Sequence, residues 1–246
     1  MMTAMRLPMI VLAAALGLAA CQKPAPVPPP TPAVAPLTEA EQNAAREALL
    51  AHEGEWDCSG PAPFDRNSRR LLVEAPEAFV VSPAGFPGPV VIGGATGATV
   101  FRKTGGGWAG YMIDPISQVQ AVRYGPAGLY LITKVTREGG GPLGIALLPT
   151  GGGALVCAGL ASPDALNAPA EHPEFVSLSI SRAGKGSLVA KAEREDKAPL
   201  WFRYDTADGG VTWTEAKTIP GPEGTDLTAP DQAKVPAPLA REIAGA

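Results

Sequence analysis

Apolar and polar residues alternate along much of this chain in short runs that are separated by glycine-rich turns. The segment Phe175–Ser181 shows the pattern most clearly, because Val176, Leu178 and Ile180 alternate with serines. A period of two is typical of a strand with one solvent-facing side, and glycine supplies the positive φ angles of tight turns. Similar pairs of runs flank glycine turns at 98–103 and 108–113, 119–124 and 129–135, 144–148 and 154–158, 175–181 and 187–192, and 200–205 and 214–219.

Three shorter runs, Leu71–Val73, Phe79–Val81 and Val90–Ile92, are also predicted to be strands. Together these runs predict an all-β fold, an antiparallel meander of hairpins. By contrast, the charged stretch Lys191–Lys197 is predicted to be a solvated turn and not a binding site.

One segment, Leu37–Glu53, has helical features instead. Thr38 and Glu41 form the Thr-x-x-Glu pattern of a capping box, and Gly54 stands where a helix C-terminal cap belongs. We therefore predict one N-terminal α-helix that lies against the β domain. Near the other end, Pro238–Ile243 is predicted to form a short helical turn.

The first residues have the features of a secretory signal. Arg6 precedes an apolar run, Leu7–Ala20, which is shorter than the ~20 apolar residues of a transmembrane helix. The run closes with Leu18-Ala19-Ala20-Cys21, which resembles the lipobox of bacterial lipoproteins. That resemblance implies cleavage before Cys21 and a diacylglycerol anchor on its thiol; the alternative is an ordinary signal peptide. In the lipoprotein family, aspartate after the cysteine tends to retain the protein at the inner membrane, so the resemblance together with Gln22 implies the outer membrane.

The chain is thus expected to have five parts. They are a lipoprotein signal peptide (1–20), a lipidated proline-rich spacer (21–36), a helix (37–54), a β domain (55–220) and a Pro/Gly-rich tail (221–246). Proline at this density favours polyproline II, which would hold the domain about 40 Å from the lipid.

The net charge of the chain bears on which classes of partner it can bind. Cleavage after residue 20 would leave 19 basic and 24 acidic side chains, a formal charge of −5. No basic patch for nucleic acid and no polybasic membrane segment is visible. We expect no nucleic-acid partner.

Two cysteines remain if Cys21 is lipidated. In an oxidising compartment, Cys58 and Cys157 are expected to form a disulfide; the alternative is two buried free thiols. Closing a loop of about 100 residues would stabilise the fold by about 4–5 kcal/mol in the chain-entropy model. Two cysteines without clustered histidines cannot complete a zinc shell, so we expect no metal.

One stretch carries a recognisable motif. Thr206, Asp208, Gly210, Thr212 and Trp213 match Ser/Thr-x-Asp-x-Gly-x-Thr-Trp, which resembles the Asp-box (BNR repeat) of sialidase-like β-propellers. In that family the motif is structural and lies away from the catalytic site. The residues agree with this role, because an aspartate can accept hydrogen bonds from its own turn and a tryptophan can pack between strands.

The motif implies a propeller-like arrangement of limited size. A blade takes ~40 residues, so the predicted β region has room for about four blades, whereas a sialidase propeller has six. We expect a small or degenerate β-propeller-like meander, with a β-sandwich or barrel as the alternative.

No catalytic constellation stands out. Six arginines and four tyrosines are candidates for a sialidase site, but none lies in that family's arginine motif: Arg66, Arg69, Arg70, Arg102, Arg123 and Arg203, with Tyr111, Tyr124, Tyr130 and Tyr204. The chain has only two histidines, His52 near the helix end and His172, which Glu171 and Glu174 flank as a weak metal-site candidate. The sequence Gly93-Gly94-x-x-Gly97 precedes strand residues, so it favours a turn over a phosphate cradle.

We therefore expect a lipoprotein without enzymatic activity or cofactor, anchored in the outer membrane and facing the periplasm. Its β domain would bind a protein or an envelope component. The alternative is a carbohydrate-binding or reduced sialidase-like glycan-processing protein.

Overall fold

The computed structural model describes residues 35–51, 58, 60–94, 98–114, 117–135, 143–160, 173–194, 197–223, 227 and 233–245. The chain divides into two compact units, Met1–Pro36 and Leu37–Ala246, and every helix and strand below belongs to the second. The predicted signal peptide, Cys21 and nearly all of the spacer lie outside the described residues. No helix among the described residues is long and apolar enough to cross a membrane.

The predicted N-terminal helix is present as α1, Glu39–Ala51. Its capping box forms as expected: the backbone N–H of Thr38 donates to Glu41 Oε2 at 2.8 Å, and that of Glu41 donates to Thr38 Oγ1 at 3.3 Å. Ala45 and Leu49 are buried. The helix therefore lies against the rest of the fold through the narrow face that contains these two residues.

The prediction that Leu71–Val73 is a strand is wrong, because these residues end a second helix, α2, Arg66–Val73. Asp65 caps this helix by accepting the backbone N–H of Ser68 at 2.7 Å. Leu71–Val73 are buried in it, and Arg69 Nη1 donates to the carbonyls of Trp108, at 3.0 Å, and Ile243, at 3.3 Å.

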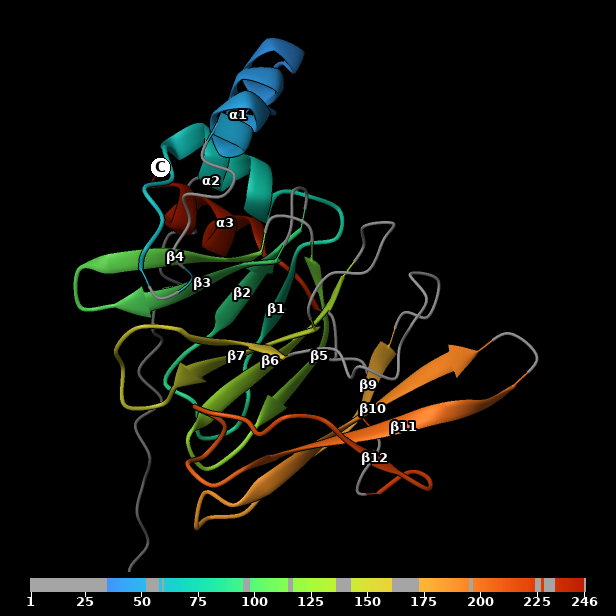
Figure 1. The fold of residues 1–246 in the computed structure, drawn as a ribbon. Coiled ribbons are helices and arrows are strands. Elements are labelled where there is room, and N and C mark those ends of the chain that lie inside the picture. The colour runs from blue at the N-terminus through green and yellow to red at the C-terminus, as the bar shows by residue number, and fades with distance from the viewer. Residues whose placement is uncertain are drawn as a thin grey trace, which may run out of the picture. The chain divides into compact units, whose positions relative to one another are not determined.

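Three antiparallel sheets make up most of the fold (Figure 1). Sheet A has the order β13-β1-β2-β3-β4 and contains β1 (Phe79–Val81), β2 (Val90–Gly93), β3 (Ala98–Thr104), β4 (Gly107–Asp114) and β13 (Ala233–Lys234). Sheet B contains β5 (Ser117–Tyr124), β6 (Gly128–Val135), β7 (Leu143–Pro149) and β8 (Val156–Leu160) in sequence order. Sheet C has the order β12-β11-β10-β9 and contains β9 (Pro173–Ile180), β10 (Gly186–Arg194), β11 (Lys197–Thr206) and β12 (Lys217–Ile219).

The end of the chain returns to the first sheet. β13 pairs with β1, with Lys234 opposite Phe79, and α3 (Ala237–Ala244) follows. The helical turn predicted at 238–243 is confirmed as part of α3. The segment 221–246 is therefore built into the fold at its end and is more than a tail.

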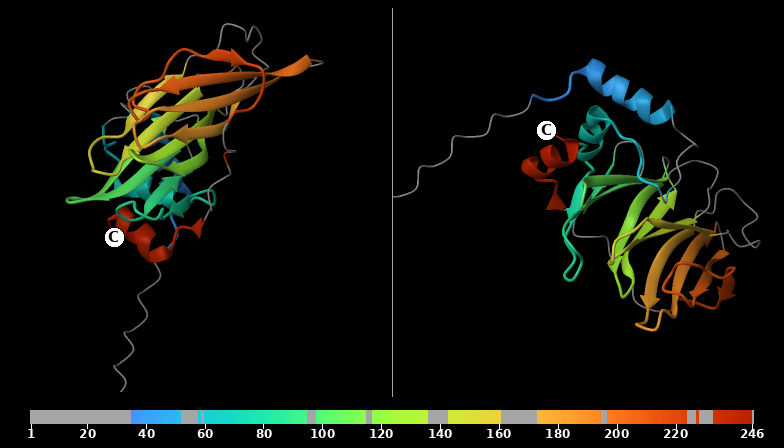
Figure 2. Two further views of the ribbon diagram at one scale, coloured as in Figure 1. Left: turned by 90° about the horizontal axis from the view of Figure 1, so that it is seen from below. Right: turned by 90° about the vertical axis from the view of Figure 1, so that its left-hand side faces the viewer.

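The sheets and helices form successive layers (Figures 1 and 2). Leu49 of α1, Leu72 of α2 and Ile243 of α3 share a core with Phe101 of sheet A. The three helices therefore cover one face of sheet A.

The other face of sheet A packs on sheet B, where Ile92 and Val100 share a core with Leu131 and Leu148. A separate core joins the far side of sheet B to sheet C. The all-β prediction with an N-terminal helix is confirmed. The meander forms three sheets instead of the expected four or so blades, and the described strands close no barrel because every sheet has two edge strands.

The predicted cysteine pair also meets. Cys58 and Cys157 form a disulfide with their Cα atoms 6.1 Å apart and a sequence separation of 99 residues. Cys157 belongs to β8, whereas Cys58 precedes α2 and packs against the core between sheets A and B. The bond therefore joins the N-terminal part of the unit to sheet B.

Candidate functional site

Two places are candidates for a functional site: the turn between β11 and β12, and the face of sheet C that points away from sheet B. The first, Thr206–Trp213, contains the motif found in the sequence and is called the Asp208 turn below. Its geometry decides whether the aspartate is available for chemistry.

Asp208 directs its carboxylate into its own turn. Oδ1 accepts the backbone N–H groups of Val211 at 3.1 Å and Thr212 at 2.9 Å, and Oδ2 accepts the hydroxyl of Thr212 at 2.6 Å. Thr206 Oγ1 donates to Oδ1 at 2.9 Å and accepts the N–H of Gly210 at 2.9 Å. Both carboxylate oxygens therefore hold the turn, as the sequence predicted for this aspartate.

Trp213 and two glycines fasten the turn to sheet B. Trp213 Nε1 donates to the carbonyl of Gly210 at 3.0 Å, and its partly buried ring packs on the core between sheets B and C. Gly210 has a φ of 89°, and a Cβ there would lie 2.9 Å from Cε1 of Tyr130. The buried Tyr130 hydroxyl, from β6, donates to the carbonyl of Gly209 at 2.6 Å.

Hydrogen bonding lowers the pKa of Asp208 to about 2, first through the Thr212 hydroxyl and then through the Thr212 backbone N–H. A carboxylate with this pKa stays ionised at neutral pH and is a poor general acid. The Asp208 turn is therefore a structural element.

Asp208→Asn is expected to lower the free energy of unfolding by about 1–2 kcal/mol at pH 7, because an amide NH₂ cannot accept the two Thr212 donors. The native pKa of about 2 lies below the ordinary aspartate value of about 3.9 in the unfolded chain. The stabilisation by ionised Asp208 is thus complete above about pH 4 and is lost as the pH falls towards 2.

Urea denaturation of the wild type and the variant at several pH values from 7 to 2 measures this difference. Glu215→Gln, at an exposed carboxylate of the same connection, is the matched control and should leave stability nearly unchanged. A wild-type–variant difference that stays constant from pH 7 to pH 2 would contradict the assigned role of the Asp208 charge.

The second place is the outer face of sheet C. Leu188, Ala190, Phe202 and Tyr204 point into the core shared with sheet B, so the intervening side chains of β10 and β11 point to the other side. We call this surface the outer C face and define it by six residues, Lys191, Glu193, Trp201, Arg203, Asp205 and Lys217.

Trp201 is the aromatic residue of the outer C face. It lies directly opposite Lys191 of β10 and Ile219 of β12 in the strand register. Its ring is partly buried, and Lys191 Nζ lies 5.7 Å from the ring centroid, within range of a cation–π contact. Lys191 also forms an ion pair with Glu193.

Arg203 organises the neighbouring part of the face. Its Nε lies 3.0 Å from Asp205 Oδ1 and its Nη1 lies 2.8 Å from Glu223 Oε2. Lys217 Nζ lies 3.3 Å from Asp205 Oδ2. The backbone carbonyl of Glu223 accepts the hydroxyl of Ser177 from β9 at 2.6 Å. Glu223 thus ties β11 to β9 across the face and limits side-chain motion there.

The prediction that Lys191–Lys197 is a solvated turn is wrong for its first half, because β10 extends to Arg194. The alternation of Ala190 and Ala192 with Lys191 and Glu193 was the signal that identifies this part of the strand. A similar alternation over Leu200–Asp205 places Trp201 and Arg203 on the same side. These patterns place the side chains on one side of each strand, but the pairing of β10 with β11 is what brings them together.

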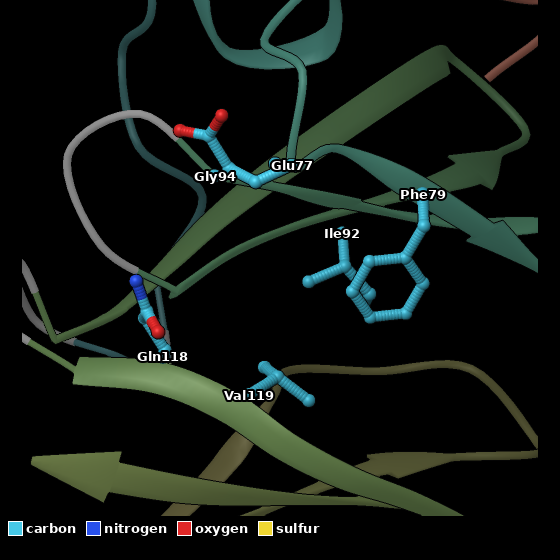
Figure 3. Close-up of a pocket in the computed structure, with 7 residues that line it drawn as sticks. Glu77, Phe79, Ile92, Gly94, Gln118 and Val119 are labelled. Carbon is cyan, nitrogen blue, oxygen red and sulfur yellow. The ribbon is translucent and has the colours of Figure 1, made fainter. Parts of the chain in front are cut away.

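A small cavity of about 120 Å³ lies at the edge between sheets A and B (Figure 3). Phe79, Ile92 and Val119 form its apolar part, and Glu77 and Gln118 lie on different sides of it. The Glu77 side chain occupies the space beside Gly94, so a carboxylate lies at the glycine pair at the end of β2. This charge disfavours a phosphate; residues 95–97 of the predicted turn lie outside the described residues.

The arginines and tyrosines considered from sequence have dispersed roles. Arg69 and Arg102 donate to backbone carbonyls, and Arg70 pairs with Glu74 on α2. Three tyrosines, Tyr111, Tyr130 and Tyr204, are buried, whereas Tyr124 is 42% exposed.

His52, Glu171 and His172 lie outside the described residues. Within the described part of the chain, no group of three His, Cys, Asp or Glu side chains is placed to hold a metal ion. Of the residues considered for chemistry, Arg203 lies on the outer C face. That face offers hydrogen-bond donors, acceptors and one aromatic ring.

No protein-family model, curated protein or solved structure matches the chain.

Proposed function

We propose that this protein is a lipid-anchored protein of the cell envelope whose β domain binds a protein or another envelope component without catalysing a reaction. The binding role is supported by the structure of the outer C face. There, Trp201 lies on a paired strand among charged side chains that hold one another in place. A rigid surface of this kind binds with little loss of side-chain entropy.

The non-catalytic part of the proposal rests on how the motif carboxylate is used. Asp208, the acid that the sequence motif singled out, gives both oxygens to its own turn. The sialidase-like alternative would need a catalytic acid elsewhere, because in the family that the motif resembles the Asp-box lies away from the catalytic site. A carbohydrate-binding role without turnover remains compatible with the aromatic ring of Trp201.

The proposed localisation is the outer membrane, with the β domain in the periplasm. The support for it is the apolar run that ends at Cys21, the following Gln22, the proline-rich spacer and a disulfide suited to an oxidising compartment. The lipid on Cys21 would be the membrane contact, and the spacer would give the β domain its reach.

Cys21→Ser is expected to abolish incorporation of labelled fatty acid into the protein, because serine lacks the thiol that is acylated. Without that lipid, and once the signal is removed, the protein should leave the membrane fraction. Growing cells with labelled palmitate and fractionating them measures both effects. Ala25→Ser, in the same spacer, keeps Cys21 and the disulfide; it is the matched control and should retain the label. Unchanged labelling and membrane fractionation of Cys21→Ser would contradict the anchor.

The binding role is tested with the mature lipidated protein, which is solubilised in detergent micelles and immobilised on a surface. Sonicated envelope fragments should bind it saturably, whereas vesicles of the extracted envelope lipids alone should not. Equal responses to fragments and lipid vesicles would contradict the proposal that the β domain recognises a component other than lipid.

A further inference from the structure

We propose that the outer C face binds an uncharged glycan, with a pyranose ring stacked on Trp201. This inference rests on the proposed binding function and names its ligand class and site. The argument uses the charge of the face, the setting of the aromatic ring and the small apolar area around it.

The charges of the outer C face are balanced among themselves. Lys191 pairs with Glu193, and Arg203 and Lys217 both pair with Asp205. Glu223 gives Arg203 a second carboxylate from the segment after β12. A strongly anionic or cationic ligand would have to compete with these pairs, whereas an uncharged ligand leaves them intact.

An uncharged polyhydroxyl ligand can use the groups that surround the ring. Sugar hydroxyls both donate and accept hydrogen bonds, so they match the ammonium donors of Lys191 and the carboxylate acceptors of Glu193 on the strand beside Trp201. Hydrogen bonds to charged groups are stronger than neutral ones. Neighbouring strands lie about 4.8 Å apart, a spacing that one sugar ring can bridge.

The ring of Trp201 provides the apolar contact that such a ligand needs. The C–H groups of a pyranose are weakly positive, and they can lie against the negative face of an indole. Lys191 and Ile219 are the cross-strand neighbours of Trp201. The cation–π contact with Lys191 restrains the ring, so stacking requires little ordering of the side chain.

The apolar area is too small and too interrupted by charge for the core of a protein interface, which is depleted of charged residues. Val189, on the same side of β10, is fully buried. Ile219, the neighbour of Trp201 on β12, is a partly exposed apolar residue beside the ring. One aromatic ring framed by paired charges fits a sugar ring better than a protein surface.

The test is titration of the mature lipidated protein with neutral oligosaccharides, in a polyoxyethylene detergent so that the headgroup is not a sugar. The probes are gluco-, manno- and galacto-oligosaccharides and tetra-N-acetylchitotetraose, compared with hyaluronan as an acidic glycan and chitosan as a basic one. We expect saturable binding of at least one neutral probe. Trp201→Ala should weaken that binding at least about tenfold, and Trp201→Phe should weaken it less.

Tyr124→Ala removes an exposed aromatic residue elsewhere and is the matched control, which should bind like the wild type. Binding of the charged glycans alone, or equal affinity of Trp201→Ala and wild type, would overturn the inference. If no glycan binds while envelope fragments still bind saturably, the glycan assignment fails and the proposed binding function stands. If neither binds, both fail.

Discussion

Removing the Cys58–Cys157 disulfide is expected to lower the free energy of unfolding by about 4–5 kcal/mol. The physical reason is that the bond closes a loop with a sequence separation of 99 residues, and opening it restores chain entropy to the unfolded state. The double variant Cys58→Ala, Cys157→Ala removes the bond without leaving a thiol. Chemical denaturation of the double variant and the wild type measures the loss.

Two comparisons make this result specific. The wild type in excess reductant should fall to the stability of the double variant, whereas the double variant should not respond to reductant. Removal of either cysteine alone opens the same loop and should cost about as much. A loss below about 1 kcal/mol would show that the loop is already ordered in the unfolded chain or that the bond is strained.

Trp213→Ala is expected to lower the free energy of unfolding by about 2–3 kcal/mol, below the range for a fully buried tryptophan because this ring is partly buried. The change removes ring contacts with the core between sheets B and C, and the hydrogen bond from Nε1 to the Gly210 carbonyl. The Asp208 turn would then be held to sheet B mainly by Tyr130. Urea denaturation at pH 7 measures the loss.

Trp213→Phe separates the two contributions. Phenylalanine keeps much of the apolar contact but lacks Nε1, so it should cost about 1 kcal/mol, the value of one hydrogen bond. A loss below about 1 kcal/mol for Trp213→Ala would show that the ring does not act as a wedge between the turn and the core.

The parts of the fold that could be predicted from sequence are those with local causes. The capping box of Thr38 and Glu41 starts α1 by contacts three residues apart. The β runs follow from period-two alternation and from glycine turns. The pairing of Cys58 with Cys157 was expected from the even count that the proposed lipidation of Cys21 would leave. The Asp208 turn was predictable because its hydrogen bonds lie within seven residues.

The incorrect sequence predictions concern features that depend on contacts between distant parts of the chain. Leu71–Val73 is an apolar run too short for periodicity to distinguish helix from strand. Its helical state depends on the Asp65 cap and on contacts of α2 with β4 and α3 through Arg69. The number of sheets depends on how segments stack, and stacking has no local signature in a meander of similar hairpins.

The outer C face was missed for a related reason. Lys191, Glu193 and Trp201 are ordinary residues for a solvent-facing strand side, and the charged stretch from Lys191 favoured a turn. Pairing of β10 with β11 brings Lys191 opposite Trp201, and Glu223 reaches Arg203 from 20 residues further along the chain. Neither contact can be inferred from spacing alone.

The central claim is that the β domain meets its ligand at the outer C face. The most direct measurement is photo-cross-linking in living cells, with a photoreactive residue at Glu193 on that face or at Tyr124 on sheet B. We predict an adduct from position 193 that Trp201→Ala removes, and none from position 124. Equal adducts from both positions, or an adduct at 193 that Trp201→Ala leaves unchanged, would contradict it.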